Sequence, residues 1–202
     1  STYLYELKKN AFSKVPNLQL VAVSTWLKEQ VSMSFLKTYT THVIYNGIDT
    51  NIFFPRNDTN IRKKYGLEGK FVIMGVSTAW SEKKGLSDFI KLGNQISDDE
   101  VIVLVGLDDC MNKDLPSNII SINRTNSKNE LAELYSLANV LLSLSFAETF
   151  GLTIIEGMAC GTPAVVYDNT AQKELVTGSV GFTVRTGDVE AVYKAIRIIK
   201  SN

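Results

Sequence analysis

The feature of this sequence that most restricts its fold is a regular alternation of short apolar runs with helix-like stretches after residue 60. Phe71–Val76, Glu100–Val105 and Val140–Ser143 are apolar almost throughout, without the alternation expected of strands that have one face in water. Helix-like segments at residues 85–96 and at Lys128–Leu137 separate these runs. The pattern predicts an α/β fold, a Rossmann-like parallel sheet with helices on both faces.

The same pattern continues on both sides of these segments. Further strands are expected at residues 18–23, 41–45, 118–122, 163–167 and 180–184. Further helices are expected at residues 25–36, 60–65, 151–160 and 188–199, with a helical turn at 172–176. Because ligands of such sheets bind beyond the carboxyl ends of the strands, the candidate functional loops are those that follow Val76, Val105, Ile122, Ser143 and Tyr167.

One of these loops leads into the most distinctive stretch of the chain, Glu-Thr-Phe-Gly-Leu-Thr-Ile-Ile-Glu-Gly-Met-Ala-Cys-Gly-Thr-Pro at residues 148–163. Glu148 precedes the expected helix, and Glu156 lies within it, with seven residues between them. Free N–H groups and the helix dipole make the first turn of this helix an anion site. Gly151 allows a ligand to approach the backbone closely.

Glu156 lies in an otherwise apolar, small-residue helix that is expected to be mostly buried. Burying an unpaired carboxylate costs on the order of several kcal/mol, so a polar group must meet it. That group is either another side chain, in which case Glu156 is structural, or a ligand. The residues alone leave both interpretations open.

Two other loops at the same edge contain cations. Lys83 and Lys84 lie between a strand and a helix, where two lysines oppose the helix dipole unless they meet a phosphate. Otherwise they are ordinary solvated charges. Arg124 follows the strand expected at 118–122, and it either contacts a base or phosphate or is a surface arginine.

Composition and missing motifs narrow the function. The 21 basic and 21 acidic side chains give no net positive field for nucleic acid or an anionic membrane. His42 is the only histidine, and Cys110 and Cys160 lie in no metal-binding spacing, which favours plain thiols and a reducing cytoplasm. No G-x-G-x-x-G helix start, P-loop or run of eighteen apolar residues occurs, which argues against a nicotinamide-dinucleotide fold, a P-loop nucleotidase and a membrane span.

Taken together, these residues resemble glycosyltransferase family 4, the group 1 family of retaining GT-B enzymes. The resemblance rests mainly on the Glu-x7-Glu block with its Phe-Gly-Leu and its Glu-Gly-Met-Ala-x-Gly-Thr-Pro ending. Lys84-Gly85 after a strand matches a second motif, and residues 45–49, followed by Phe53-x-Pro55, resemble the interdomain joint. Residues 24–27 are similar to the last part of the acceptor-side domain.

The resemblance implies a division of the chain. Residues 1–46 would be the remnant of an acceptor domain, 47–58 an interdomain linker, and 59–202 a donor-binding domain whose closing helix lies beyond this chain. The implied activity is hexose transfer, with retention, from a nucleotide diphosphate sugar to a glycan or lipid-linked acceptor. The implied location is the cytoplasm or the inner face of the membrane. This chain alone is expected to bind donor without transferring sugar, because acceptor-side groups come from the missing domain.

Carried over residue by residue, the family's roles fall on the same loops. Glu148 and Lys84 would be catalytic, because Glu148 would contact sugar hydroxyls and Lys84 would neutralise the diphosphate. Glu156 would bind the ribose diol, and Arg124 would lie near the base. No metal or other cofactor is expected. The backbone that would hold phosphate and sugar belongs to Thr149, Phe150, Gly151 and Leu152.

Two departures from the family pattern concern this site. Gly75-Val76-Ser77 lacks the arginine that the family carries after the first donor-domain strand, and Lys83 is the expected substitute. Lysine supplies a point charge rather than a planar fork. Leu144-Ser145 also lacks the family's proline before serine. Three alternatives remain open: a nucleotide-sugar-binding module without turnover, another GT-B enzyme such as a sugar epimerase or phosphorylase, and a flavodoxin-like binding or signalling domain, which would give no reason for Glu148 and Glu156 together.

Overall fold

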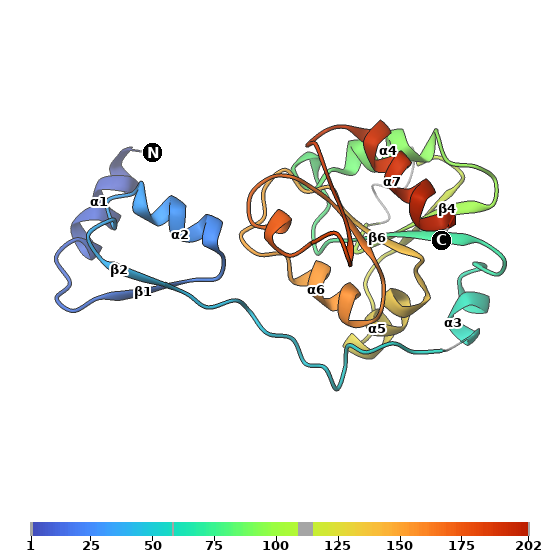
Figure 1. The fold of residues 1–202 in the computed structure, drawn as a ribbon, viewed down its shortest axis with the longest axis horizontal. Helices are drawn as coiled ribbons and strands as arrows, with labels where there is room; N and C mark the ends of the chain where they lie inside the picture. The colour runs from blue at the N-terminus through green and yellow to red at the C-terminus, as the bar shows by residue number, and fades with distance from the viewer. Residues whose placement is uncertain (1, 58, 109–114, 202) are drawn as a thin grey trace. The chain divides into compact units, whose positions relative to one another are not determined.

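The computed structural model describes residues 2–57, 59–108 and 115–201. These residues form two compact units, which divide between Gly47 and Ile48, and each unit contains its own parallel sheet (Figure 1). Cys110 and residue 58 of the expected linker lie outside the described residues. Cys160 is a buried free thiol. No helix in the described part of the chain is long and apolar enough to cross a membrane.

The smaller unit is organised around two parallel strands. β1 (Gln19–Ala22) pairs with β2 (Thr40–Val43), and α2 (Thr25–Ser32) lies between them in the sequence. Ser24 caps α2, because its side chain accepts a hydrogen bond from the Leu27 N–H at 3.1 Å. The extended conformation of Ser24 therefore ends the strand region and starts the helix within a few residues.

Two features of this unit differ from the sequence prediction. α1 (Thr2–Phe12) precedes the first expected strand, and because it buries none of its side chains, no core-facing stripe reveals it. α2 ends at Ser32 rather than at residue 36. Beyond it, the Ser34 hydroxyl donates to the Val31 carbonyl at 2.8 Å and accepts from the Leu36 N–H at 3.0 Å, a local arrangement that competes with helix.

The larger unit confirms the predicted α/β fold. Its sheet has six strands, every neighbouring pair is parallel, and their spatial order is β5-β4-β3-β6-β7-β8. This is the Rossmann order, which reverses between β3 and β6, and ligands bind such sheets at the point of reversal. The strands are β3 (Phe71–Val76), β4 (Glu100–Val105), β5 (Ile119–Ile122), β6 (Val140–Ser143), β7 (Ala164–Tyr167) and β8 (Gly181–Val184).

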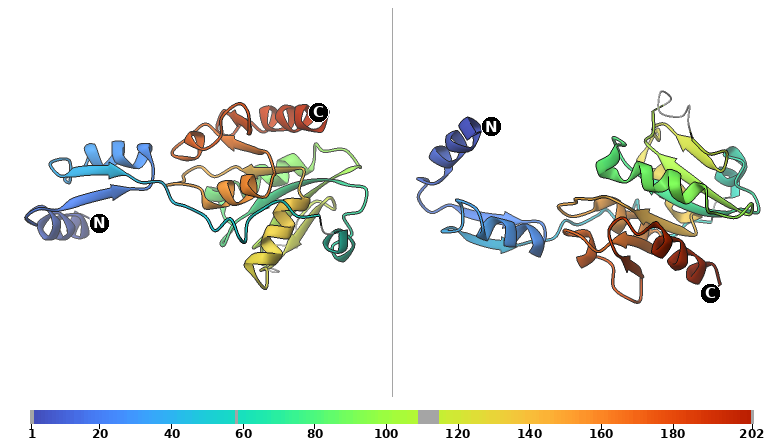
Figure 2. Two further views of the ribbon diagram at one scale, coloured as in Figure 1. Left: turned by 60° about the horizontal axis from the view of Figure 1, so that its bottom comes forward. Right: turned by 90° about the horizontal axis from the view of Figure 1, so that it is seen from above.

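Helices cover both faces of this sheet (Figure 2). One face carries α4 and α7, which pack over Ile73 and its neighbours, and the other carries α3 and α5 over Val72 and its neighbours. α6 joins the second group through Ile154, which packs on Val166. Adjacent strand residues therefore serve opposite faces, which explains the continuous apolar runs. The remaining elements are α3 (Thr59–Lys64), η1 (Glu82–Lys84), α4 (Leu86–Gly93), α5 (Lys128–Leu137), α6 (Leu152–Ala159), η3 (Gln172–Glu174) and α7 (Val189–Ser201).

The segment that follows the smaller unit packs on the larger one. Phe53 is buried and meets the Tyr135 ring edge-on, with 6.2 Å between ring centroids. Arg56 donates to the Ile52 carbonyl at 2.8 Å and forms an ion pair with Glu133 at 3.5 Å. Residues 48–57 therefore contribute to the core and surface of the larger unit. Their role as a linker between two domains stays a prediction.

Candidate functional site

The predicted functional loops meet at one edge of the larger sheet, because the carboxyl ends of parallel strands share an edge. Backbone hydrogen bonds continue the sheet pairing into these loops. The Ser77 N–H donates to the Val105 carbonyl at 3.1 Å, and the Gly106 N–H donates to the Ile122 carbonyl at 2.7 Å. Between β3 and β6, the Phe146 N–H donates to the Lys83 carbonyl at 2.9 Å. The loops after β3, β4, β5 and β6 are therefore held side by side.

Gly85 brings the lysine turn into contact with the loop after β6. Its φ is +75°, and a Cβ atom at this position would lie only 2.3 Å from the Leu144 carbonyl oxygen. Both the left-handed backbone and the lack of space require glycine. As a result, the η1 turn, which ends at Lys84, lies directly on the first residues after β6.

Lys84 and Glu148 form an ion pair across this contact. The Lys84 ammonium donates to Oε1 of Glu148, although the two residues are 64 positions apart in the sequence. Their side chains are 35% and 21% exposed, so the pair remains accessible to a ligand. The two residues that the sequence predicts to be catalytic are thus brought together at the reversal point of the sheet.

The loop after β7 fixes the backbone of Glu148. The Glu148 N–H donates to Oγ1 of Thr170 at 3.0 Å, and the Glu148 carbonyl accepts from the Ala171 N–H at 3.2 Å. Gly151 then starts α6 with φ +108°, and a Cβ there would lie 2.7 Å from Cδ1 of Ile154. Since Gly151 offers no side-chain cap, the first turn of α6 keeps the character of an anion site.

A pocket of about 520 Å³ opens at the same edge of the sheet, between the ends of three strands and the first turns of α6, and neither Lys84 nor Glu148 lines it. Its walls combine backbone of the strand ends with polar side chains of the following loops. The lining residues are Val76, Ser77, Thr78, Val105, Gly106, Asp108, Asn123, Arg124, Thr125, Leu131, Leu152, Thr153 and Glu156.

Glu156 lines this pocket and is half-buried. The hydroxyl of Tyr135 donates to its Oε2 at 3.1 Å, and no ion pair of Glu156 occurs among the residues that the structure describes. Burial raises the pKa of Glu156 above its ordinary value, while the Tyr135 hydrogen bond and the charge of Lys128 act in the opposite direction. A neutral hydroxyl therefore satisfies one carboxylate oxygen, and among the described residues the charge of Lys128 acts on the carboxylate only from beyond ion-pair distance.

The model of the family "Glycosyl transferases group 1" matches residues 57–202. The chain belongs to this family. The match covers the larger unit from residue 57 onward, and it includes both the Lys84–Glu148 pair and the Glu156 pocket.

Relatives and solved structures agree with membership of the group 1 glycosyltransferases. Over 167 residues the chain is 28% identical to N-acetyl-alpha-D-glucosaminyl L-malate synthase of Bacillus anthracis, a match that covers 78% of this chain and 44% of the relative. The fold matches sucrose-phosphate synthase of Thermosynechococcus elongatus with a TM-score of 0.83 and 22% identity, over 100% of this chain and 53% of that one. It matches Anabaena HepE in complex with UDP-glucose with a TM-score of 0.78 and 22% identity, over 100% and 58% of the two chains. The chain thus spans about half the length of these proteins.

In this family member the other predicted site residues divide into those that line the pocket and those that do not. Arg124 and Leu152 line the pocket with Glu156, and both side chains are exposed. Thr149 and Lys83 are exposed outside the pocket lining, whereas Phe150 is buried and anchors the turn before α6. The substitution of Lys83 for the family's arginine stays a prediction.

Sequence reasoning missed several residues at this edge of the larger sheet. Tyr135 resembles a core position of α5, and no local pattern indicates that its hydroxyl meets Glu156. Asp108 lies in the loop after β4, which lines the pocket. The position of this loop at the carboxyl end of a strand was the one sequence signal that could have indicated Asp108. Thr170 has φ +46°, an unusual value for a β-branched residue, and backbone conformation of this kind cannot be read from sequence.

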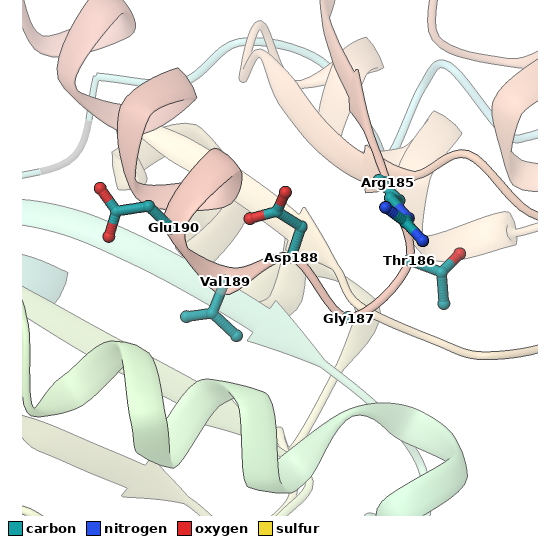
Figure 3. A pocket seen from close by; sticks show the side chains of 6 residues that line it. All are labelled: Arg185, Thr186, Gly187, Asp188, Val189 and Glu190. Carbon is teal, nitrogen blue, oxygen red and sulfur yellow. The ribbon is translucent and has the colours of Figure 1, made fainter.

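A second hollow of about 470 Å³ lies on the surface where β8 leads into α7 (Figure 3). One continuous segment lines it, from Arg185 to Glu190, and none of the predicted site residues takes part. Asp188 caps α7, since its Oδ1 accepts from the Ala191 N–H at 2.9 Å. Among the described residues, no group of three His, Cys, Asp or Glu side chains is suitable for holding a metal ion.

Proposed function

We propose that this chain is mainly the donor-binding half of a retaining glycosyltransferase of family 4, which moves a hexose from a nucleotide diphosphate sugar to a glycan or lipid-linked acceptor. The observation that carries the proposal is the Glu156 carboxylate, which lines the pocket, is desolvated and forms no ion pair within the described part of the chain. A ribose offers two neutral hydroxyl donors at a spacing that a carboxylate accepts. Such donors satisfy the buried carboxylate without a countercharge.

Lys84 would neutralise the diphosphate. Its ammonium has three N–H donors, and the Glu148 contact occupies one of them. The remaining donors and the first turn of α6 would meet phosphate oxygens. When the bond between the anomeric carbon and the β-phosphate oxygen breaks, the electron pair stays on that oxygen, and these groups stabilise the charge there. Fixed cations then do what a metal ion does in other transferases, and Lys83 adds a second charge to the same turn.

Glu148 would contact hydroxyl groups of the donor sugar. Lys84 holds one of its carboxylate oxygens, so the other would lie close to the phosphate end of a bound donor. The backbone of Thr149, Phe150, Gly151 and Leu152 would support the same part of the donor. Arg124 lies at the opposite, pocket-lining end and would approach the base. The solved complex of HepE with UDP-glucose supports a donor of this class.

Isothermal titration of the chain with UDP, UDP-glucose, GDP and GDP-mannose tests the proposal. We expect at least one nucleotide pair to bind, and Lys84→Ala to weaken it by about 10- to 100-fold, the usual contribution of charge-assisted hydrogen bonds. Lys64→Ala is the matched control, because Lys64 also pairs with a glutamate, Glu130, but lies outside the pocket lining. Absence of binding by all four compounds contradicts the proposed function, and unchanged affinity in Lys84→Ala contradicts the diphosphate role.

Transfer itself requires acceptor-side groups that we expect from the rest of the acceptor domain. Incubation with radiolabelled UDP-glucose or GDP-mannose and a lipid-linked acceptor should give no glycosylated product with this chain alone. A longer protein that carries the whole acceptor domain should form product with retained anomeric configuration. A nucleotide-sugar-binding module would instead bind donor and fail to transfer it in both forms.

A further inference from the structure

The loop after β7 contacts the loop that carries Glu148 at more points than the Glu148 backbone alone. Asn169 Nδ2 donates to the Ser145 carbonyl at 3.1 Å, and Gln172 Nε2 donates to the same carbonyl at 2.8 Å. The Ser143 hydroxyl, at the end of β6, donates to Oε1 of Gln172 at 2.8 Å. The whole stretch from β6 to Glu148 is thus bound to one neighbouring loop.

Thr170 is the member of this loop that reaches Glu148. Its hydroxyl accepts from the Glu148 N–H at 3.0 Å and donates to Oδ1 of Asn169 at 3.1 Å. A hydroxyl group can accept and donate at the same time, so both directions are fixed at this atom. Thr170 makes these contacts with φ +46°, a left-handed conformation that β-branched residues rarely adopt.

A buried network holds Thr170 in this conformation. Gln172 has no exposed surface, and its Nε2 donates to Oδ1 of Asn169 at 2.8 Å in addition to the Ser145 carbonyl. Asn169 also donates to Oγ1 of Thr186, at 3.0 Å. A buried polar network whose members are satisfied fixes one geometry, because each alternative leaves a polar group unpaired.

We propose that Thr170 is a positioning residue for Glu148 and determines how strongly the site prefers a sugar nucleotide to the nucleoside diphosphate. The inference rests on the proposed function, in which Glu148 contacts the sugar. Thr170 and Ala171 bind the N–H and carbonyl groups of Glu148, so only the side chain of that residue remains to be oriented. Lys84 holds one carboxylate oxygen, and in the proposed complex the fixed backbone leaves the other available to the sugar.

The test compares three variants, Thr170→Val, Thr170→Gly and Thr170→Ser, with the wild-type chain. Valine keeps the shape and removes the hydroxyl, serine keeps the hydroxyl, and glycine removes the hydroxyl while it suits the left-handed backbone. The measured quantity is the dissociation constant of the nucleoside diphosphate divided by that of the sugar nucleotide. The pair is UDP with UDP-glucose or GDP with GDP-mannose, whichever pair the wild-type chain binds. Thermal unfolding of each variant is recorded alongside.

We expect Thr170→Val and Thr170→Gly to reduce this ratio by about 5- to 10-fold, which corresponds to one hydrogen bond, and Thr170→Ser to retain it. Affinity for the nucleoside diphosphate alone should change by less than about twofold. In the Glu148→Gln background, Thr170→Gly should have no further effect on the ratio, since both changes act through one side chain. The glycine variant keeps the test decisive if the valine variant does not fold.

Four results overturn the inference while nucleotide binding survives. The first three are an unchanged ratio in a folded glycine variant, an equal loss for both ligands, and a wild-type ratio near one. Serine that behaves like valine also overturns it, because the hydroxyl would then be irrelevant. Failure of the wild-type chain to bind any of the four nucleotides is a different result, which contradicts the proposed function itself.

Discussion

Glu148 and Glu156 flank the start of α6, yet their environments are opposite. Glu148 pairs with the Lys84 ammonium and stays accessible, whereas Glu156 is half-buried and meets a tyrosine hydroxyl. The difference shows how one residue type serves two purposes. A carboxylate that pairs with a lysine suits a region that would bind phosphate. A desolvated carboxylate without an ion pair suits neutral hydrogen-bond donors such as hydroxyl groups. The two ends of the site are thus distinguishable by electrostatics alone.

The contrast depends on local geometry rather than on residue type. Gly85 allows the Lys84 turn to reach the Glu148 loop, and Gly151 ends that loop in a left-handed turn. Glu148 also lies before the positive end of the α6 dipole, which favours its charge. Glu156 is the fifth residue of this eight-residue helix, so it lies beyond the first turn, where the dipole effect is strongest.

The largest effect is expected from Gly85→Ala, which would disrupt the Lys84–Glu148 pair and so remove the difference between the two carboxylates. The added Cβ meets the Leu144 carbonyl oxygen at 2.3 Å, so the lysine turn must move away from the Glu148 loop. We expect a loss of about 2–4 kcal/mol in urea unfolding and a strong loss of nucleotide affinity.

Gly66→Ala is the matched control for this prediction. Gly66 has φ +65°, and nothing lies within 4 Å of a Cβ built there, so the variant carries the backbone strain without the collision. We expect a loss of about 1 kcal/mol and normal nucleotide affinity. Equal destabilisation by the two variants would mean that the contact with Leu144 is unimportant.

The second effect separates the two carboxylates directly. Glu156→Gln should weaken the binding of UDP and the binding of UDP-glucose alike, by about 10-fold, because it removes a charged hydrogen-bond acceptor for the ribose. Glu148→Gln should weaken only the sugar nucleotide, and it should bind UDP at least as tightly as wild type, because Lys84 gains freedom to meet phosphate. Titration with both ligands measures this, and parallel losses in the two variants contradict the division of roles.

A third effect concerns pH and Tyr135. Protonation of Glu156 should weaken nucleotide binding, so affinity should fall as pH decreases through the pKa of Glu156, which burial raises. Tyr135→Phe removes the hydrogen bond that favours the ionised form, so it should raise this pKa further and move the decline to higher pH.

The groups that face Glu156 are Tyr135 and Lys128 of α5 and the pocket residues Asp108 and Arg124. The nucleotide phosphate and the charged side chains of Lys128, Asp108 and Arg124 are present in wild type and in both variants, Glu156→Gln and Tyr135→Phe. Affinities are therefore measured from pH 4.5 to 8 relative to Glu156→Gln. A decline at the same pH in Tyr135→Phe and wild type would show that Tyr135 does not control the ionisation of Glu156.

The smallest effect is on stability. The pKa of Glu156 is higher in the folded chain than its ordinary value of 4.5, so the folded state holds this proton more tightly. Its contribution therefore decreases as pH rises from about 4.5 through the folded pKa. Glu156→Gln should gain stability relative to wild type over that interval, as judged by Tm at pH 4.5 and 7.5. A relative gain by wild type would indicate that an undetected cation neutralises Glu156.

The order of elements in the larger unit could be predicted from the sequence because its signals are local. β3, β4, α5 and β6 have the predicted bounds, since continuous apolar runs and the Ser127 N-cap mark them within a few residues. The start of α6 was also predictable from local sequence signals. The packing of residues 48–57 was not, because the side-chain partners of Phe53 and Arg56 on α5 lie about 70 to 80 positions away.

The site was predictable only where a single residue, by its type and expected burial, required a particular kind of partner. The buried position of Glu156 required a polar partner, and the sequence left a side chain and a ligand as alternatives. The structure supplies the Tyr135 hydroxyl for one oxygen and a pocket beside the carboxylate. The Thr170 and Gln172 contacts could not be inferred, because each is specified by backbone geometry across 20 or more positions.

The hydrogen bond from the Phe146 N–H to the Lys83 carbonyl has a thermodynamic consequence. Together with the Gly85–Leu144 contact, it makes the cationic turn and the acidic loop one preassembled platform. Mobile binding loops lose conformational freedom when they close over a ligand, and that loss weakens association. Here the two loops are ordered when the chain folds. A donor would therefore bind without the further loss of conformational entropy that closing mobile loops requires.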